Sequence, residues 1–229
     1  MKKISVIIPA HNEEKYLGQT LDSLRNQNFL DYETIIVPNG CSDQTVSIAQ
    51  KYLNQSTKIL PITEANVSQA RNLGAQHAQG EILLFLDADT QLEPTTLQTI
   101  AQHFKNNLSV ATTKTKPDNP QFKFKLALAF KNLYNQTKIY QGCSGALICR
   151  KEHFHSVGGY HPPLKVKEHR KLIIKLKKLG QYVVLPTYTT TSMRRFQHWG
   201  LTKATYFWLK EFIKNYTTDL KKSDYESVR

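Results

Sequence analysis

Short apolar runs recur along the first half of the chain, and a segment with helical spacing follows each of them. The run at 82–86 is apolar at every position and too short for a helix, which is typical of a buried strand. Strands are expected at 3–9, 33–37, 57–60 and 82–86, and helices at 13–27, 43–52, 67–78 and 94–104. Because strand and helix alternate, the pattern predicts an α/β fold with a mostly parallel sheet flanked by helices.

Polar residues directly follow three of these strands, at 9–12, 38–43 and 87–89. The carboxyl ends of parallel strands meet at one edge of the sheet, where ligands bind in such folds, so these segments should converge. Asp87 and Asp89 are two positions apart and share one face of an extended chain. Their repulsion favours a hard divalent cation that also binds substrate phosphates. Capping of the following turn is the alternative, and it is the commoner outcome for an isolated D-x-D sequence.

Charge is divided unevenly between the two halves of the chain. Residues 1–113 carry a net charge of −3 and residues 114–229 carry +16, which together give the +13 of the whole sequence. Such asymmetry indicates an anionic partner for the C-terminal half: a nucleic acid, an anionic membrane face or a phosphorylated substrate. A merely well-solvated surface accounts for the charge about equally well.

Length and cysteine content narrow the class of protein. The 229 residues suit one large domain, and no apolar stretch approaches the length of a membrane span. The apolar run near the N-terminus is too short for the core of a signal peptide. Three cysteines without zinc-type spacing suit a reducing compartment, so a cytoplasmic protein is expected.

The sequence signatures of several other ligand classes are missing. The chain contains neither G-x-G-x-x-G nor G-x-x-x-x-G-K-[ST], which mark dinucleotide-binding folds and P-loops. The G-x-S-x-G and H-E-x-x-H sequences of hydrolases and zinc proteases are missing as well. The acids at the strand end therefore remain the main chemical signal.

Ordered blocks of the sequence resemble the family 2 glycosyltransferases of the GT-A (Rossmann-like) fold. They are SVIIPAHNEEKYLGQTLDSL (5–24), IIVPNGCSDQT (35–45) and VSQARNLGAQHAQGEILLFLDADT (67–90), followed more weakly by 142–160 and 167–180. SMRRF (192–196) is similar to an S-x-R-R-[FY] segment in a small cytoplasmic branch of the family. The resemblance covers most of residues 3–200. It implies a nucleotide-diphosphate sugar donor and Mn²⁺ or Mg²⁺ as cofactor.

The resemblance also implies the residues of the site. Asp87 and Asp89 would serve the ribose and the metal, and Arg71 would lie near the diphosphate or brace the pocket. A pair of arginines suits a diphosphate, because guanidinium groups bind phosphate through two parallel hydrogen bonds. The residues expected to bind the nucleotide sugar are Pro9, Ala10, Asn12, Glu13, Asn39, Arg71, Asp87, Ala88, Asp89, Arg194 and Arg195.

Two blocks depart from the family pattern. Pro38-Asn39 replaces the usual acidic pair, and since an amide both donates and accepts, the base of the donor stays open. Glu168-His169 replaces a Glu-Asp pair whose Asp commonly supplies the catalytic base. We expect Glu168 to be that base, because it is the nearby carboxylate and begins a predicted helix. His169 is the alternative, since a neutral imidazole also accepts a proton.

We therefore expect an inverting glycosyltransferase domain over residues 1–200, with a nucleotide-sugar half of about 1–113 and an acceptor half of about 114–200. Residues 114–140 are expected to form a mobile loop that leads into a helix. Residues 201–229 predict a basic amphipathic helix that docks on the domain or contacts an anionic membrane, which would suit a lipid-linked hydroxyl acceptor.

Two other functions stay open at this point. A sugar-phosphate nucleotidyltransferase shares the sheet but needs a glycine-rich loop after the first strand, and PAHNEEKYLG is not one. A basic nucleic-acid-binding module explains the C-terminal charge but not the acids at the strand ends. We therefore expect no nucleic acid as a partner.

Overall fold

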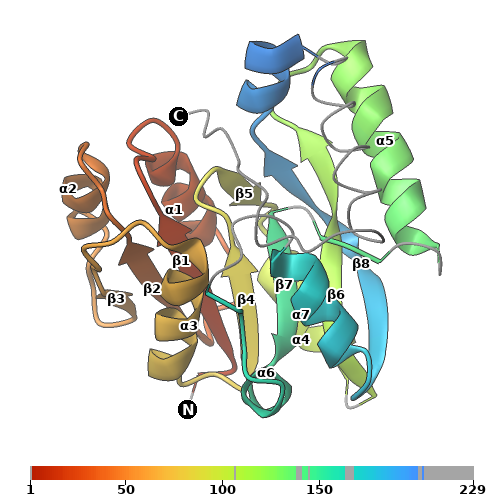
Figure 1. Ribbon diagram of the computed structural model, residues 1–229, viewed down its shortest axis with the longest axis horizontal. Helices are drawn as coiled ribbons and strands as arrows, with labels where there is room; N and C mark the ends of the chain where they lie inside the picture. Colours follow the sequence, from red (N-terminus) through yellow and green to blue (C-terminus); the bar gives the residue numbers. More distant parts are fainter. Residues whose placement is uncertain are drawn as a thin grey trace.

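The computed structural model describes residues 2–105, 107–137, 141–143, 145–162, 168–200 and 203, and it has the expected α/β fold (Figure 1). The strands in these residues are β1 (Ile4–Ala10), β2 (Tyr32–Pro38), β3 (Thr57–Ile59), β4 (Ile82–Leu86), β5 (Thr90–Leu92), β6 (Leu108–Pro117), β7 (Ala146–Arg150) and β8 (Gln181–Thr191). The helices are α1 (Leu17–Arg25), α2 (Thr45–Gln50), α3 (Val67–His77), α4 (Thr96–His103), α5 (Phe122–Gln136), α6 (Lys151–Ser156) and α7 (Glu168–Leu176). Residues 194–200 are helical as well.

The strands form one sheet in the order β3-β2-β1-β4-β7-β6-β8-β5. The four strands predicted from the first half, β1 to β4, pair in parallel, with β1 between β2 and β4. Beyond β4 the sheet is mixed: β7 is antiparallel to β4 and β6, whereas β8 is parallel to β6 and antiparallel to β5. The sheet is therefore parallel over the part that carries the predicted strand-end residues.

Helices cover both faces of the sheet, and each face has its own core. Ile8 of β1 packs in one core with side chains from α1, α2 and α4. Its neighbour Ile7 points to the opposite face and packs with side chains from α3, α6 and α7. Every residue of β1 and β4 is buried. Burial of each large apolar side chain contributes about 1.5–3 kcal/mol, so the ends of these strands are firmly positioned.

The first helix begins later than the expected range of 13–27. Residues 13–16 form a turn, and α1 starts at Leu17. Asn12 has a φ of 53°, in the left-handed region, and the backbone N–H of Glu13 donates to the Thr45 hydroxyl at 2.7 Å. These two features end β1 sharply and hold Glu13 at the edge of the sheet rather than in the helix.

The prediction of a mobile loop before the helix in 114–140 is wrong for its first part. β6 extends to Pro117, and α5 begins at Phe122. The Asn132 side-chain amide of α5 bonds both backbone groups of Thr115 at 2.8 Å, which fastens the helix to β6. Two threonines of this strand bury hydroxyls that hydrogen-bond to neighbouring strands, Thr112 to Ala146 O at 2.7 Å and Thr113 with the Thr189 hydroxyl at 3.0 Å. Buried polar side chains therefore interrupt the apolar pattern that would have marked the strand.

The short strand β5, directly after Asp89, was not predicted either. The predicted helix at 201–229 lies outside the described residues except for Lys203. In the described part of the chain, no helix has both the length and the apolar composition needed to cross a membrane.

Candidate active site

The turn after β4 brings Asp87 and Asp89 to the carboxyl edge of the sheet, as expected. The Asp87 N–H donates to Gly145 O at 2.8 Å, and the Ser192 N–H donates to Asp89 O at 3.3 Å. Gly145 has a φ of 75°, and a Cβ there would lie 2.4 Å from the Thr90 hydroxyl oxygen. A glycine is therefore needed where the start of β7 passes the two acids.

Arg71 connects Asp87 with the candidate base. This arginine lies on α3 and is 3% exposed. Its guanidinium donates to Asp87 Oδ1 at 2.8 Å and to Glu168 Oε1 at 2.7 Å. Burial alone would raise the pKa of Asp87, but Arg71, together with His169 and Arg195, outweighs it and holds that pKa below its usual value. The structure thus places Arg71 as a brace between two carboxylates that are 81 residues apart in the sequence.

Arg194 makes a second cluster with Glu13 and Asp89. Its guanidinium binds both oxygens of Glu13, at 2.6 and 2.7 Å, and lies 3.1 Å from Asp89 Oδ2. The same group stacks over the Tyr16 ring, 4.5 Å from its centroid. Glu13 is 5% exposed, so this pair is shielded from water. The S-x-R-R-F segment therefore reaches the strand ends, as the resemblance implies for Arg194.

The two clusters together hold more carboxylates than guanidinium groups. Burial raises the pKa of Asp89 to about 6; Arg194 opposes this shift, and the nearby Asp87 and Glu13 carboxylates add to it. Asp89 thus has a cation beside it but is incompletely compensated. Its side chain is 19% exposed and remains reachable.

This chemistry fits a hard divalent ion held by one carboxylate and substrate oxygens. A cage made wholly of protein does not fit, because no group of three or more His, Cys, Asp or Glu side chains gathers as a metal site in the described part of the chain.

Glu168 and His169 occupy the first turn of α7 but have different surroundings. Both known contacts of Glu168 use Oε1, and no described residue donates a hydrogen bond to Oε2. His169 Nδ1 is 2.8 Å from the Tyr160 hydroxyl, and its buried Nε2 lacks a hydrogen-bond partner among the described residues. Burial, followed by the Arg71 charge, lowers the pKa of His169 to about 4, so its ring is neutral near pH 7.

Tyr160 holds this part of the site in place. It is 2% exposed, and its backbone is bonded in both directions by the Asn72 side-chain amide at 2.9 Å. Its ring lies 5.2 Å from the Arg71 guanidinium carbon. Tyr160, which follows Gly158 and Gly159, therefore supports both Arg71 and His169. Asn72 was not predicted as a site residue, and its only sequence signal was its position directly after Arg71 in the block 67–90.

Other predicted residues line the crevice less directly. The Asn39 side chain is 3% exposed and donates to Ala10 O at 2.9 Å, so its amide nitrogen faces the strand ends rather than open space. Asn12 Oδ1 accepts from the Ser42 N–H at 2.8 Å. Pro9, Ala10 and Ala88 are buried. These three residues therefore contribute backbone rather than side-chain groups to this edge of the sheet.

Arg195 follows Arg194 on the same helical turn, and its guanidinium lies 5.8 Å from the centre of the Trp199 ring. Its charge also acts on Asp87 and Asp89, whose pKa values it lowers. Tyr16, which stacks under Arg194, was not predicted from the sequence. The only sequence feature that could have indicated this stacking is the position of an aromatic residue about one helical turn after Glu13.

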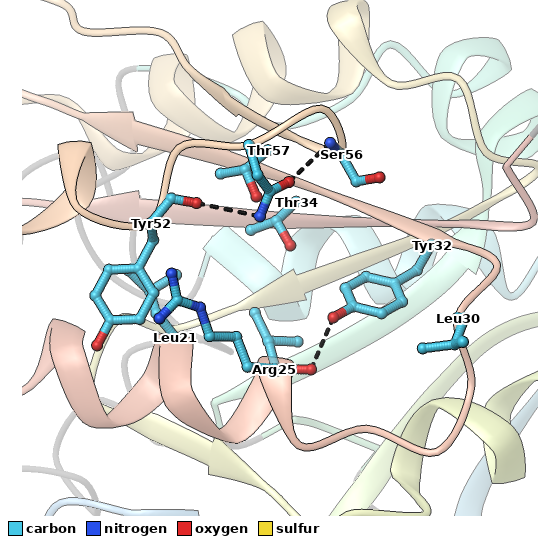
Figure 2. Close-up of a pocket in the computed structure, with 10 residues that line it drawn as sticks. Leu21, Arg25, Leu30, Tyr32, Thr34, Tyr52, Ser56 and Thr57 are labelled. Carbon is cyan, nitrogen blue, oxygen red and sulfur yellow. Dashed lines mark hydrogen bonds between the residues drawn. The ribbon is translucent and has the colours of Figure 1, made fainter.

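Two hollows of about 220 Å³ lie on the surface, at different edges of the sheet. One is lined by Asn12, Glu14, Lys15, Tyr16 and Asp43, and so adjoins the cluster of Glu13 and Arg194 through Tyr16. The other lies beside the amino ends of β2 and β3, where Tyr32 donates to Leu24 O at 2.7 Å (Figure 2). No carboxylate lines that second hollow, so it lacks the chemistry of the candidate site.

The comparisons with known proteins agree with this geometry. Residues 5–158 match the family model described as Glycosyl transferase family 2. Poly(ribitol-phosphate) beta-N-acetylglucosaminyltransferase TarS of Staphylococcus aureus (strain Mu50) is 34% identical over 150 residues, which cover 61% of this chain and 26% of TarS. An uncharacterized glycosyltransferase of Haemophilus influenzae is 27% identical over 188 residues, which cover 76% of this chain and 61% of that protein. This chain thus spans only about a quarter of TarS.

Solved structures show the same fold. S. aureus TarS 1–349 in complex with UDP-GlcNAc superposes with a TM-score of 0.65 at 25% identity, over 83% of this chain and 58% of that one. The mannosyltransferase PcManGT from Pyrobaculum calidifontis, in complex with GDP-Man and Mn²⁺, has a TM-score of 0.75 at 18% identity, over 95% of this chain and 65% of that one. The family match spans more than half of the chain, and the predicted blocks fold into a GT-A domain with acids and arginines at its strand ends. The chain therefore belongs to glycosyl transferase family 2.

Proposed function

We propose that this chain transfers a sugar from a nucleotide-diphosphate sugar to an acceptor hydroxyl, with inversion and with the help of a divalent cation. The observation that carries the proposal is the cluster of Asp89, Glu13 and Arg194 at the carboxyl edge of β1 and β4, in a family 2 chain. The cluster offers a carboxylate for the cation and a guanidinium for the diphosphate. A nucleic-acid-binding module or a nucleotidyltransferase finds no comparable support.

The donor would lie across the ends of β1, β2 and β4. Asn12, Asn39 and the backbone at Ala10 border the nucleoside, Asp87 and Asp89 border the ribose and the cation, and the two adjacent arginines border the diphosphate. A divalent cation at Asp89 would neutralise charge on the diphosphate as it leaves. The arginines would add bidentate hydrogen bonds to the same oxygens, which strengthen as the negative charge grows.

Glu168 is the proposed base. Its Oε1 is held by Arg71 at 2.7 Å, an ion pair that orients the side chain and leaves Oε2 to accept the proton of the acceptor hydroxyl. The hydroxyl oxygen then bonds to the anomeric carbon while the bond from that carbon to the diphosphate breaks. His169 would act as a positioning residue, because the Tyr160 hydroxyl engages its Nδ1 and its ring stays neutral.

The base assignment predicts different effects for two neighbouring substitutions. Glu168→Gln keeps the shape of the side chain but removes the proton acceptor, so turnover should fall by about 10²–10⁴ while donor binding is kept. His169→Asn should lower turnover less. Release of nucleoside diphosphate measures turnover, and the thermal shift with donor measures binding. Loss of turnover in His169→Asn alone would assign the base to His169 instead.

Donor binding is the first test of the proposed function. UDP sugars are the first candidates, because TarS, the relative at 34% identity, is solved with UDP-GlcNAc, and GDP and dTDP sugars complete the panel. With Mn²⁺ and donor at about 100 Kd, the midpoint of unfolding should rise by roughly 5–10 °C. Asp89→Asn should abolish the Mn²⁺-dependent part of the shift, whereas Asp31→Asn, an exposed carboxylate away from the crevice, should not. If no donor in the panel shifts the midpoint, the proposal fails.

A further inference from the structure

Helix α5 is apolar on two opposite faces. Phe124 and Leu128 on its inner face are 2% and 4% exposed. They pack with Met193 and Phe196, which flank the two arginines of the site. This contact, together with the bonds from Asn132 to β6, fixes the orientation of the helix on the sheet. Packing on Met193 and Phe196 explains why the inner face of α5 is apolar, but it does not explain the apolar outer face.

The outer face of α5 carries a stripe of large apolar side chains that stay largely exposed in the described part of the chain. Phe122, Leu126, Phe130 and Leu133 are 77%, 59%, 71% and 64% exposed. At about 100° per residue these four positions fall within an arc of roughly 80° on the helix, opposite the buried pair. Isolated exposed apolar residues are normal, but a contiguous patch of this kind marks an interaction surface. In Figure 1, α5 stands at the outer margin of the molecule beside β6 and β8, so its outer face is turned away from the sheet.

Positive charge borders this stripe on both sides. Lys123 and Lys125 are exposed and fall on opposite flanks of it on the helix. The helix Phe122–Gln136 contains three lysines and no acidic residue. It also lies in the half of the chain that carries +16. Apolar side chains flanked by lysine are the pattern of a helix that lies in the interface of an anionic bilayer.

We propose that the outer stripe of α5 docks this protein on the surface of an anionic lipid bilayer. Phe122 and Phe130 would enter the boundary between headgroups and acyl chains, and the flanking lysines would bind lipid phosphates. Because the inner face of α5 packs on Met193 and Phe196, the docked helix would also support the segment that carries Arg194. An acceptor carried on a lipid would suit such docking, an extension that rests on the proposed function.

Co-sedimentation of the full chain with vesicles tests the docking without donor or acceptor, so its result is independent of transfer activity. Wild type should bind phosphatidylglycerol-containing vesicles and not pure phosphatidylcholine, and binding should weaken with salt. Phe122→Ser/Phe130→Ser should lower partitioning at least about tenfold, and Lys123→Gln/Lys125→Gln about fivefold or more for each lysine. The matched control is Leu30→Ser/Leu53→Ser, at apolar positions 78% and 61% exposed on the other half of the protein, which should bind as wild type does.

Three outcomes would overturn the proposal. The first is absence of salt-sensitive binding by the wild-type protein. The second concerns Trp208 and Phe212, two aromatic residues in the sequence of the predicted amphipathic helix at 201–229. Loss of binding in Trp208→Ser/Phe212→Ser while the Phe122/Phe130 variant still binds would place the contact in that segment. The third is a concentration-dependent dimer in light scattering without lipid that Phe122→Ser/Phe130→Ser dissociates, which would make a second copy of the chain the occupant of the stripe. Circular dichroism and unfolding midpoints show that each variant is folded.

Discussion

At the scale of single residues, Asp89 is a carboxyl group whose ionisation the fold opposes. Its pKa of about 6 in the folded protein lies above the ordinary value of 3.8. The folded state therefore binds the proton more tightly than the unfolded chain. The resulting stabilisation is complete below pH 3.8 and is lost as the pH rises through about 6.

Asp89→Asn should therefore stabilise the ligand-free protein at pH 8, by about 2 kcal/mol, and the difference from wild type should shrink towards pH 4. Urea unfolding at both pH values measures the free energy of unfolding. Asp31→Asn, at an exposed carboxylate, should show no such trend. A gain that grows at acid pH instead would contradict the assignment of the shift to Asp89.

The pKa of His169 is shifted downwards on folding, so its effect on stability has the opposite pH dependence. Its folded pKa of about 4 lies below the ordinary 6.5, so the unfolded chain takes up the proton first. The stability that the neutral ring contributes is present above pH 6.5 and is lost as the pH falls towards 4. His169→Gln should remove this acid-side loss, which a flatter stability profile between pH 6.5 and 4.5 would show.

At the scale of elements, α3 packs closely on β1 at Gly74. A Cβ added at Gly74 would lie 2.4 Å from Ile7 Cγ2 in the buried core. Gly18 on α1 has only the Tyr52 hydroxyl, at 3.7 Å, near its missing Cβ. The two helical glycines therefore allow a controlled comparison, because an added methyl group would clash at Gly74 and would fit at Gly18.

Gly74→Ala should destabilise the protein by about 1–2 kcal/mol, because overpacking outweighs the gain in helix propensity. Gly18→Ala should be neutral or stabilising by up to about 1 kcal/mol, since only propensity changes. Thermal unfolding of both variants measures the difference. Equal midpoints would show that Ile7 gives way without cost and that α3 is less tightly packed than the contact implies.

The elements that the sequence predicted are those whose apolar pattern is simple. β1, β2 and β4 contain nearly continuous apolar runs, and these strands and the short β3 were predicted within a few residues of their bounds. β6 ends in a run of threonine and lysine, so its last part, from residue 114 on, was predicted as a loop, and the three-residue β5 is too short for any periodicity. Ordered motifs placed Asp87, Asp89 and Arg194 at one edge. They could not show that Arg71 joins Glu168 across 97 positions, because that contact depends on how α7 packs.

At the scale of the whole molecule, Arg71 ties the two halves of the chain together. Its ion pairs connect α3 and β4 with α7, and its side chain is 4% exposed. Arg71→Met would leave Asp87 and Glu168 as neighbouring carboxylates without their shared cation. Removing one partner from a buried ion pair costs about 3–5 kcal/mol.

Arg71→Met should therefore lower the free energy of unfolding by about 3 kcal/mol. Lys116→Met should lower it by less than about 1 kcal/mol, because Lys116 is 48% exposed and its pair with Glu93 is screened by water. Chemical denaturation compares the two variants at pH 7.5. Similar losses in both would mean that the Arg71 contacts contribute no more than a surface pair does.

The position of Arg194 between Glu13 and Asp89 determines how the donor and the metal ion affect each other's binding. Glu13 and Asp89 already hold a cationic side chain, so a metal ion alone must compete with Arg194 for Asp89. A diphosphate alone meets an Arg194 guanidinium that two carboxylates already engage. When both ligands are present, the diphosphate attracts Arg194 away from the acids and the freed carboxylate is open to the ion. Donor and metal should therefore bind with positive cooperativity, and each should raise the affinity for the other by the same factor.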